Sequence, residues 1–185
     1  LSFSGFDING DITVGYTSNY SLLDPSNTST LFDVWTLSVS NADASLALED
    51  VFTLDILGLE IGISYLTTSS MNDDRSWFYV DGTATSASSG LLDTVNLKAT
   101  DLEFSYAQAI HDSSDGLLNL SLSPISVGGF TQSSSDSDAY FSIGASAELD
   151  IAGQTLSADL GLGLNPVTRD EIRVDVEKGS IQLAA

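Results

Sequence analysis

Clustered acidic and amide side chains are the residues of this sequence whose types and spacing point most directly to chemistry. The candidate metal ligands are Asp7, Asn9, Asp11, Asp136 and Asp138. The first three put oxygens at alternate positions around Gly10, and the last two stand in the serine-rich run 133–138. Ca²⁺ binds about six to eight such oxygens, although neither group fits the EF-hand loop. Calcium is therefore the candidate cofactor, and a pair of solvated polar turns is the alternative.

Two aromatic residues of one expected strand, Trp77 and Tyr79, are the candidate carbohydrate-binding residues. They share one parity in the run WFYV, whereas Phe78 and Val80 share the other, so one of the two pairs can face outward. An exposed pair of rings with polar tips is a platform on which a sugar can stack. The alternative is a strand that is buried on both of its faces.

No residue is assigned a catalytic role. The single histidine, His111, lies in the run AIHDSSDG, but a catalytic triad is defined by spatial geometry that sequence adjacency does not give. Two carboxyl groups for glycoside hydrolysis must stand about 5 to 9 Å apart. A chain with 26 acidic residues meets that condition by chance, so we expect a protein that is not an enzyme.

The charge and composition of the chain limit its partners. Twenty-six acidic residues stand against five basic ones, and the formal net charge over 185 residues is −21. Such a field repels nucleic acid and anionic lipid, so neither is expected as a partner. No apolar run reaches the roughly 18 residues of a membrane helix, and we expect no membrane insertion. The chain has no cysteine, which leaves its compartment open.

Long strands with alternating apolar residues must position these side chains. The clearest pattern is the run 140–164, in which two alternating segments flank Gly153 and Gln154. A two-residue loop at this dipeptide pairs Ile151 with Leu156 and puts the apolar residues of both strands on one face. The pattern therefore predicts an antiparallel hairpin.

A second hairpin is expected near the N-terminal end. Residues 9–11 would form its three-residue loop, with Gly10 free to adopt a left-handed conformation. Such a loop pairs Ile8 with Ile12. The polar side chains of the first candidate calcium site would then surround a turn.

Two long apolar runs change phase part of the way along. Residues 52–56 alternate on one parity and residues 57–65 on the other, and the same change separates 95–99 from 102–106. A β-bulge or a sharp bend shifts parity in this way, for instance where a strand passes from one sheet to another. We therefore expect bulged or bent strands, with the first change near Ile56–Leu57.

These patterns predict a single all-β domain over residues 1–185. Its expected form is an antiparallel β-sandwich or barrel-like sheet of about 10–13 strands with essentially no helix. The chain starts at Leu1 in mid-alternation, so we expect it to be excised from a longer chain. Similar patterns near 32–70, 75–110 and 138–165 indicate internal repeats, although any protein with long amphipathic strands looks repetitive.

Long strands decorated with Ser, Thr and Asp, as in FSIGASAELDIAGQTLSADLGLGL, occur here without Cys and with very few Lys. This texture resembles the repeat domains of giant secreted or surface-anchored bacterial proteins of the adhesin-like kind. The resemblance spans the whole chain but identifies no functional residue. It implies a structural or adhesive domain that is extracellular or at the cell surface. Its implied partners are neighbouring domains of the same chain, glycans or another surface protein.

Two other functions stay open beside this one. The first is a carbohydrate-binding module that uses the aromatic pair named above. The second is a binder of an apolar ligand inside the β-structure, because inward positions such as Ala145, Ala147 and Ala158 are small and could leave space. Close sheet packing explains the same small residues.

Overall fold

The computed structural model shows an all-β chain. It describes residues 2–3, 6–23, 29–48, 52–70, 73–91, 95–110, 116–133, 140–151, 154–164 and 172–182. The strands are β1 (Ser2–Phe3), β2 (Phe6–Leu23), β3 (Ser29–Leu48), β4 (Phe52–Thr68), β5 (Ser76–Leu91), β6 (Val95–Ala109), β7 (Ile125–Val127), β8 (Phe130–Gln132), β9 (Tyr140–Ile151), β10 (Gln154–Leu164) and β11 (Ile172–Gln182). The described ranges thus hold eleven strands and no helix, which confirms the predicted fold class. Accordingly, no helix in them is long and apolar enough to cross a membrane.

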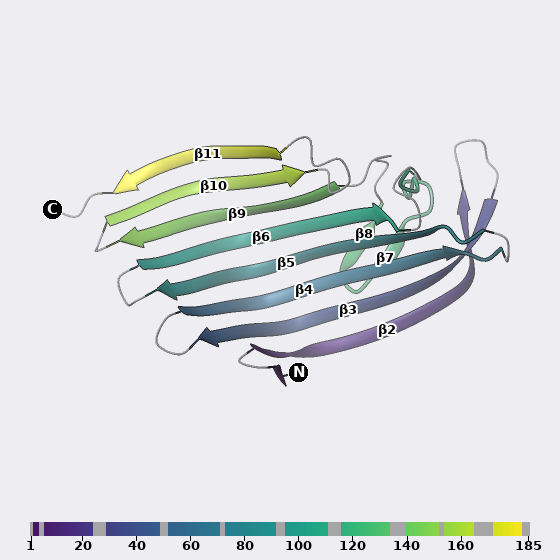
Figure 1. The fold of residues 1–185 in the computed structure, drawn as a ribbon, viewed down its shortest axis with the longest axis horizontal. Coiled ribbons are helices and arrows are strands. Elements are labelled where there is room, and N and C mark those ends of the chain that lie inside the picture. Colours follow the sequence, from purple (N-terminus) through teal and green to yellow (C-terminus); the bar gives the residue numbers. More distant parts are fainter. Residues whose placement is uncertain are drawn as a thin grey trace.

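Nine of the strands form one antiparallel sheet, shown in Figure 1. Their order is β1-β2-β3-β4-β5-β6-β9-β10-β11, so the chain meanders from one edge to the other and the sheet does not close on itself. The remaining two strands, β7 and β8, form a separate short hairpin. This hairpin lies behind the sheet in the view of Figure 1 and interrupts the meander between β6 and β9.

The predicted hairpin of residues 140–164 is present, but its register differs from the expected one by two residues. Leu156 pairs with Leu149, and Gln154 pairs with Ile151. A slip of two residues keeps every side chain on its original face, so the hydrophobic pattern fits both registers equally well.

The predicted turn at residues 9–11 is wrong, because β2 runs straight through it. Ile8 pairs with Ala44 and Ile12 pairs with Val39, so both halves of β2 find their partner in β3. A Cβ atom added to Gly10 would lie 2.5 Å from the Ala42 Cβ. The glycine therefore permits a close approach of two strands, and it does not form a turn.

The expected phase changes are β-bulges within the one sheet, and they are not corners between two sheets. Asn41 in β3, Gly58 in β4 and Asp101 in β6 have left-handed φ angles of 49°, 61° and 52°. The pairing of β4 with β5 and of β5 with β6 keeps one register on both sides of these residues. The three neighbouring strands β4, β5 and β6 therefore each contain one extra residue at the same place. Because each bulge shifts the parity by one, the apolar residues before and after it stay on the same face.

The sheet therefore has one apolar face, defined by its register. Its described members are Ile12, Val14 and Tyr16 in β2, Trp35, Leu37, Val39, Ala42 and Ala44 in β3, Leu54, Ile56, Leu59, Ile61, Ile63 and Tyr65 in β4, Phe78, Val80, Ala84 and Ala87 in β5, Leu97, Ala99, Leu102, Phe104 and Tyr106 in β6, Phe141, Ile143, Ala145, Ala147 and Leu149 in β9, Leu156, Ala158 and Leu160 in β10, and Val176 in β11. None of the described elements packs over this face, but Ala42, Ala44, Leu59 and Ala84 in β3, β4 and β5 are buried among its other side chains. The opposite side, the polar face, presents mostly Ser, Thr, Gly, Asp and Glu.

One end of the polar face is covered by residues 116–133, and the covered core lies beneath them. Trp77 and Tyr79 of β5 are its largest side chains. The Trp77 indole Nε1 donates to the Gly116 carbonyl oxygen at 3.0 Å, and the Tyr79 hydroxyl accepts from the Leu118 backbone N–H at 3.0 Å. Both aromatic groups are thus fixed by apolar packing and by a polar contact to the covering segment.

Candidate functional site

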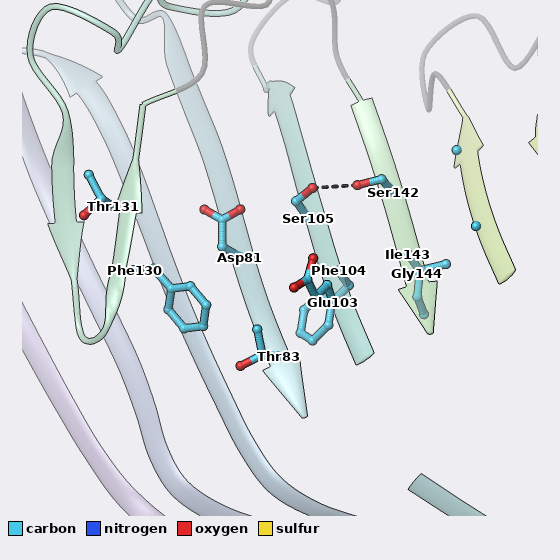
Figure 2. Close-up of a pocket in the computed structure, with 12 residues that line it drawn as sticks. Asp81, Thr83, Glu103, Phe104, Ser105, Phe130, Thr131, Ser142, Ile143 and Gly144 are labelled. Atoms are coloured by element: carbon cyan, nitrogen blue, oxygen red, sulfur yellow. Dashed lines mark hydrogen bonds between the residues drawn. The ribbon is translucent and has the colours of Figure 1, made fainter. Parts of the chain in front are cut away.

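A groove on the polar face is the candidate functional site. It lies beside the β7–β8 hairpin and crosses β5, β6, β9 and β10, with a volume of about 650 Å³ (Figure 2). The residues that carry its chemistry are Asp81, Thr83, Glu103, Ser105, Phe130, Thr131 and Ser142.

Glycine residues keep the floor of the groove open over β9 and β10. Gly144, Gly161 and Gly163 stand where the alternation points a side chain to the polar face. A Cβ atom added to Gly144 would meet nothing closer than a strand carbonyl at 3.8 Å, and one added to Gly163 nothing closer than 3.9 Å. Gly144 and Gly163 are therefore not required by packing, and their effect is to leave space.

Register brings the polar side chains of the groove together in two rows. In one row Asp81 pairs with Ser105, which pairs with Ser142; in the next, Thr83 pairs with Glu103. The Ser105 and Ser142 hydroxyl oxygens lie 2.7 Å apart and share a hydrogen bond. Because strands lie about 4.8 Å apart, a groove that crosses four of them is roughly 14 Å long.

The β7–β8 hairpin supplies the aromatic wall. The Gln132 Nε2 donates to the Gly62 carbonyl oxygen at 3.3 Å, and Ser64 also hydrogen-bonds to Gln132. A Cβ atom on Gly62 would lie 2.9 Å from the Phe130 ring, so glycine is needed here for the hairpin to sit close to the sheet. Figure 2 shows the Phe130 ring standing beside Asp81 at the edge of the groove.

The fold changes the acidity of Asp81 in the groove. Desolvation by burial raises its pKa above the ordinary 3.8, and a hydrogen bond from the Gln132 side chain partly offsets the rise. Glu103 is exposed in the adjacent strand. The groove thus combines two carboxyl groups, several hydroxyl groups and one aromatic ring. A neutral polyhydroxylated ligand suits this set, because the carboxylates and hydroxyls accept its hydrogen bonds and the ring covers its apolar face.

The two residues expected to bind carbohydrate lie elsewhere. Trp77 and Tyr79 are each only 2% exposed in the covered core. Carbohydrate binding by these residues requires ring faces that are exposed to solvent, but the segment 116–133 covers both rings. Burial also raises the pKa of the Tyr79 hydroxyl.

The expected calcium ligands are not gathered into one site by the described residues. Asp7, Asn9 and Asp11 lie along the continuous strand β2, and the Asn41 amide donates to the Asp11 carboxylate at 3.3 Å. Asp136 and Asp138 fall outside the described residues, as does His111. No group of three or more acidic, His or Cys side chains in the described ranges is placed to hold a metal ion. Calcium binding stays a prediction.

Sequence reasoning missed the groove because its residues come from five strands. The available signal was the polar alternation of D-G-T at 81–83 and E-F-S at 103–105, followed by glycine at alternate positions in G-L-G at 161–163. Such a pattern marks a solvent-facing side, but only register tells which of these residues are neighbours.

Comparisons of the chain with protein-family models, with curated proteins and with solved structures find no match.

Proposed function

We propose that this chain is a non-enzymatic binding domain of a larger cell-surface protein, and that it holds a glycan in the groove of the polar face. The observation that supports this best is the glycine floor. Three glycines leave space in front of Asp81, Glu103 and Phe130. Two of them, Gly144 and Gly163, have no packing reason for their presence. This proposal combines the adhesive role expected from the sequence with carbohydrate binding. The proposed binding residues are those of the groove and no longer the buried Trp77 and Tyr79.

The dimensions and chemistry of the groove favour a short saccharide segment. A length of roughly 14 Å accommodates more than one ring, and open ends over β10 let a longer chain continue. Phe130 provides the stacking surface that Trp77 and Tyr79 cannot provide from the core. Neutral sugars fit better than uronic or sulfated ones, because two carboxyl groups and a net charge of −21 repel anions.

A glycan array followed by titration calorimetry on the best neutral oligosaccharide tests the proposal. We expect saturable binding that Phe130→Ala weakens at least tenfold and that Glu103→Gln weakens several-fold. Glu148→Gln is the matched control, since it makes the same change on the polar face outside the groove. Leu122→Ala is the control for Phe130→Ala, because Leu122 is exposed in the same covering segment.

Two results would contradict the proposal. Binding to no glycan would remove it, and so would binding that all four variants weaken equally. Release of new reducing ends from a bound polysaccharide would make Asp81 and Glu103 a hydrolytic pair and replace the non-enzymatic assignment.

A further inference from the structure

The apolar face exposes large side chains to solvent near both edges of the sheet. Eight of its large side chains are 43 to 65% exposed, among them Ile12, Val14, Trp35 and Val176. Soluble monomers rarely show a contiguous apolar patch above a few hundred Å². The exposed residues lie toward both flanks of the sheet, in β2 and β3 on one side and in β6, β10 and β11 on the other. Between them, Ala42, Ala44, Leu59 and Ala84 are buried among neighbouring side chains of the same face.

The bulges show that the continuity of this face is built into the fold. Without the left-handed residues Asn41, Gly58 and Asp101, the apolar residues of β3, β4 and β6 would divide between the two sides. The positions between these apolar residues carry charged side chains on the opposite face. Lys98 and Glu148, which are register partners in β6 and β9, are an example. The segregation of charge from apolar surface is thus maintained through every phase change.

An aromatic row limits the apolar face at one end. It runs through Tyr16, Trp35, Tyr65, Phe78, Tyr106 and Phe141, one residue in each of six neighbouring strands. From β5 to β6 the row steps diagonally by two residues, because Phe78 pairs with Gln108 and Tyr106 pairs with Val80. Rings in adjacent strands touch, with centroids 4.5 Å apart for Tyr16–Trp35 and 6.2 Å apart for Phe78–Tyr106. One step further along the strands the same side of the sheet becomes polar, at Asp33 and Thr67.

The length of the apolar face along its strands matches that of a strand that crosses a membrane. Along β9 it extends from Phe141 to Leu149 without a charged or polar member, which is roughly 27 Å at about 3.4 Å per residue. A strand that crosses a bilayer needs about 9–11 residues, with alternate apolar side chains and aromatic residues at the boundary with the headgroups.

We propose that the apolar face contacts the hydrocarbon layer of a lipid bilayer, with the aromatic row at the headgroup boundary. A second copy of the chain fits the face less well, because each copy brings a net charge of −21 and the two would repel. The expectation of no membrane insertion came from the length of apolar runs, and that criterion applies to helices alone. Unpaired edges are costly in hydrocarbon, so in the vesicle we expect the outer strands β1 and β11 to pair with the outer strands of other copies of the chain.

The test uses the two tryptophans as probes, since Trp35 lies in the aromatic row and Trp77 in the covered core. The full chain is unfolded in urea and diluted into zwitterionic phosphatidylcholine vesicles whose acyl chains carry bromine. We expect it to float with the vesicles and to lose most of its Trp35 emission to bromine quenching. Trp35→Phe should leave a signal from Trp77 that bromine quenches several-fold less. Added anionic lipid should reduce the bound fraction.

A matched pair of charge variants separates the two faces. Ile12→Arg puts a cation on the apolar face and should reduce the vesicle-bound fraction at least tenfold. Thr13→Arg puts the same cation one residue further along β2, on the polar face, and should change the bound fraction less than twofold. Circular dichroism confirms that both variants contain β-structure. A chain that stays out of the vesicle fraction, whether monomeric, paired or aggregated, overturns the proposal, and so does equal quenching of both tryptophans.

Discussion

The two sides of strand β5 show how differently the same residue type is used in this molecule. Trp77 and Tyr79 point to the polar face and are 2% exposed under residues 116–133. Phe78, between them, points to the apolar face and belongs to a row in which Tyr16 and Trp35 are about half exposed. Alternation puts aromatic rings on both sides of the strand, but only one side has a covering segment. For these large rings, burial therefore depends on the covering segment and cannot be told from the alternation alone.

The largest expected difference between the two sides is in the free energy of unfolding when one tryptophan at a time is replaced. Trp77→Ala should lower the free energy of unfolding by about 3–5 kcal/mol, because it leaves a cavity in the covered core and an unpaired Gly116 carbonyl. Trp35→Ala should lower it by less than about 1 kcal/mol in lipid-free solution, since half of the residue is already in water. Urea unfolding of both variants measures the difference. Equal losses would mean that the two sides are covered alike.

A smaller effect is expected at the bulges that keep the apolar face continuous. Gly58→Ala should lower the free energy of unfolding by about 1–2 kcal/mol, because φ is 61° and the new Cβ would lie 2.5 Å from the Thr85 hydroxyl oxygen. Gly144→Ala is the control on the polar side, where a Cβ atom meets only ordinary contacts and stability should change by less than about 0.5 kcal/mol. Thermal unfolding of the two variants measures the difference in their stability. A Gly58→Ala variant as stable as Gly144→Ala would contradict the bulge assignment.

The smallest effect concerns the titration of Asp81 at the groove. Its pKa is raised in the folded chain, so the folded state keeps the proton to higher pH than the unfolded state does. Stability should therefore fall as the pH rises through the window between 3.8 and the raised value, and stay level above it. Asp81→Asn should remove this dependence and raise the melting temperature slightly at pH 7. The effect is small because Asp81 is only half-buried. A melting temperature of the variant that falls relative to wild type at pH 7 would mean that the ionised carboxylate stabilises the fold.

The sequence alone was sufficient for the features that depend on parity. The all-β class, the hairpin of 140–164 and the phase change at Ile56–Leu57 all follow from which residues alternate. The bulge at Gly58 is the clearest example, because a parity shift in an apolar run has few structural solutions.

Features that depend on long-range pairing could not be obtained in this way. A two-residue register slip leaves parity unchanged, so the pairing of Leu156 with Leu149 was out of reach. The continuous strand β2 was missed because Asn9–Gly10–Asp11 has turn composition, while the partner that holds it straight, β3, lies thirty residues away. The groove and the covered core both depend on where residues 116–133 fold back, and no local pattern encodes that position.

Acrylamide quenching of the two tryptophans in the lipid-free chain, at a concentration where it is monomeric, tests most directly whether one side of the sheet is covered and the other bare. The structure predicts an accessible emitter that disappears in Trp35→Phe and a remaining Trp77 signal that acrylamide barely reaches. A Trp35 signal as well protected as that of Trp77 would contradict the account, because it would mean that some part of the monomer lies over the apolar face.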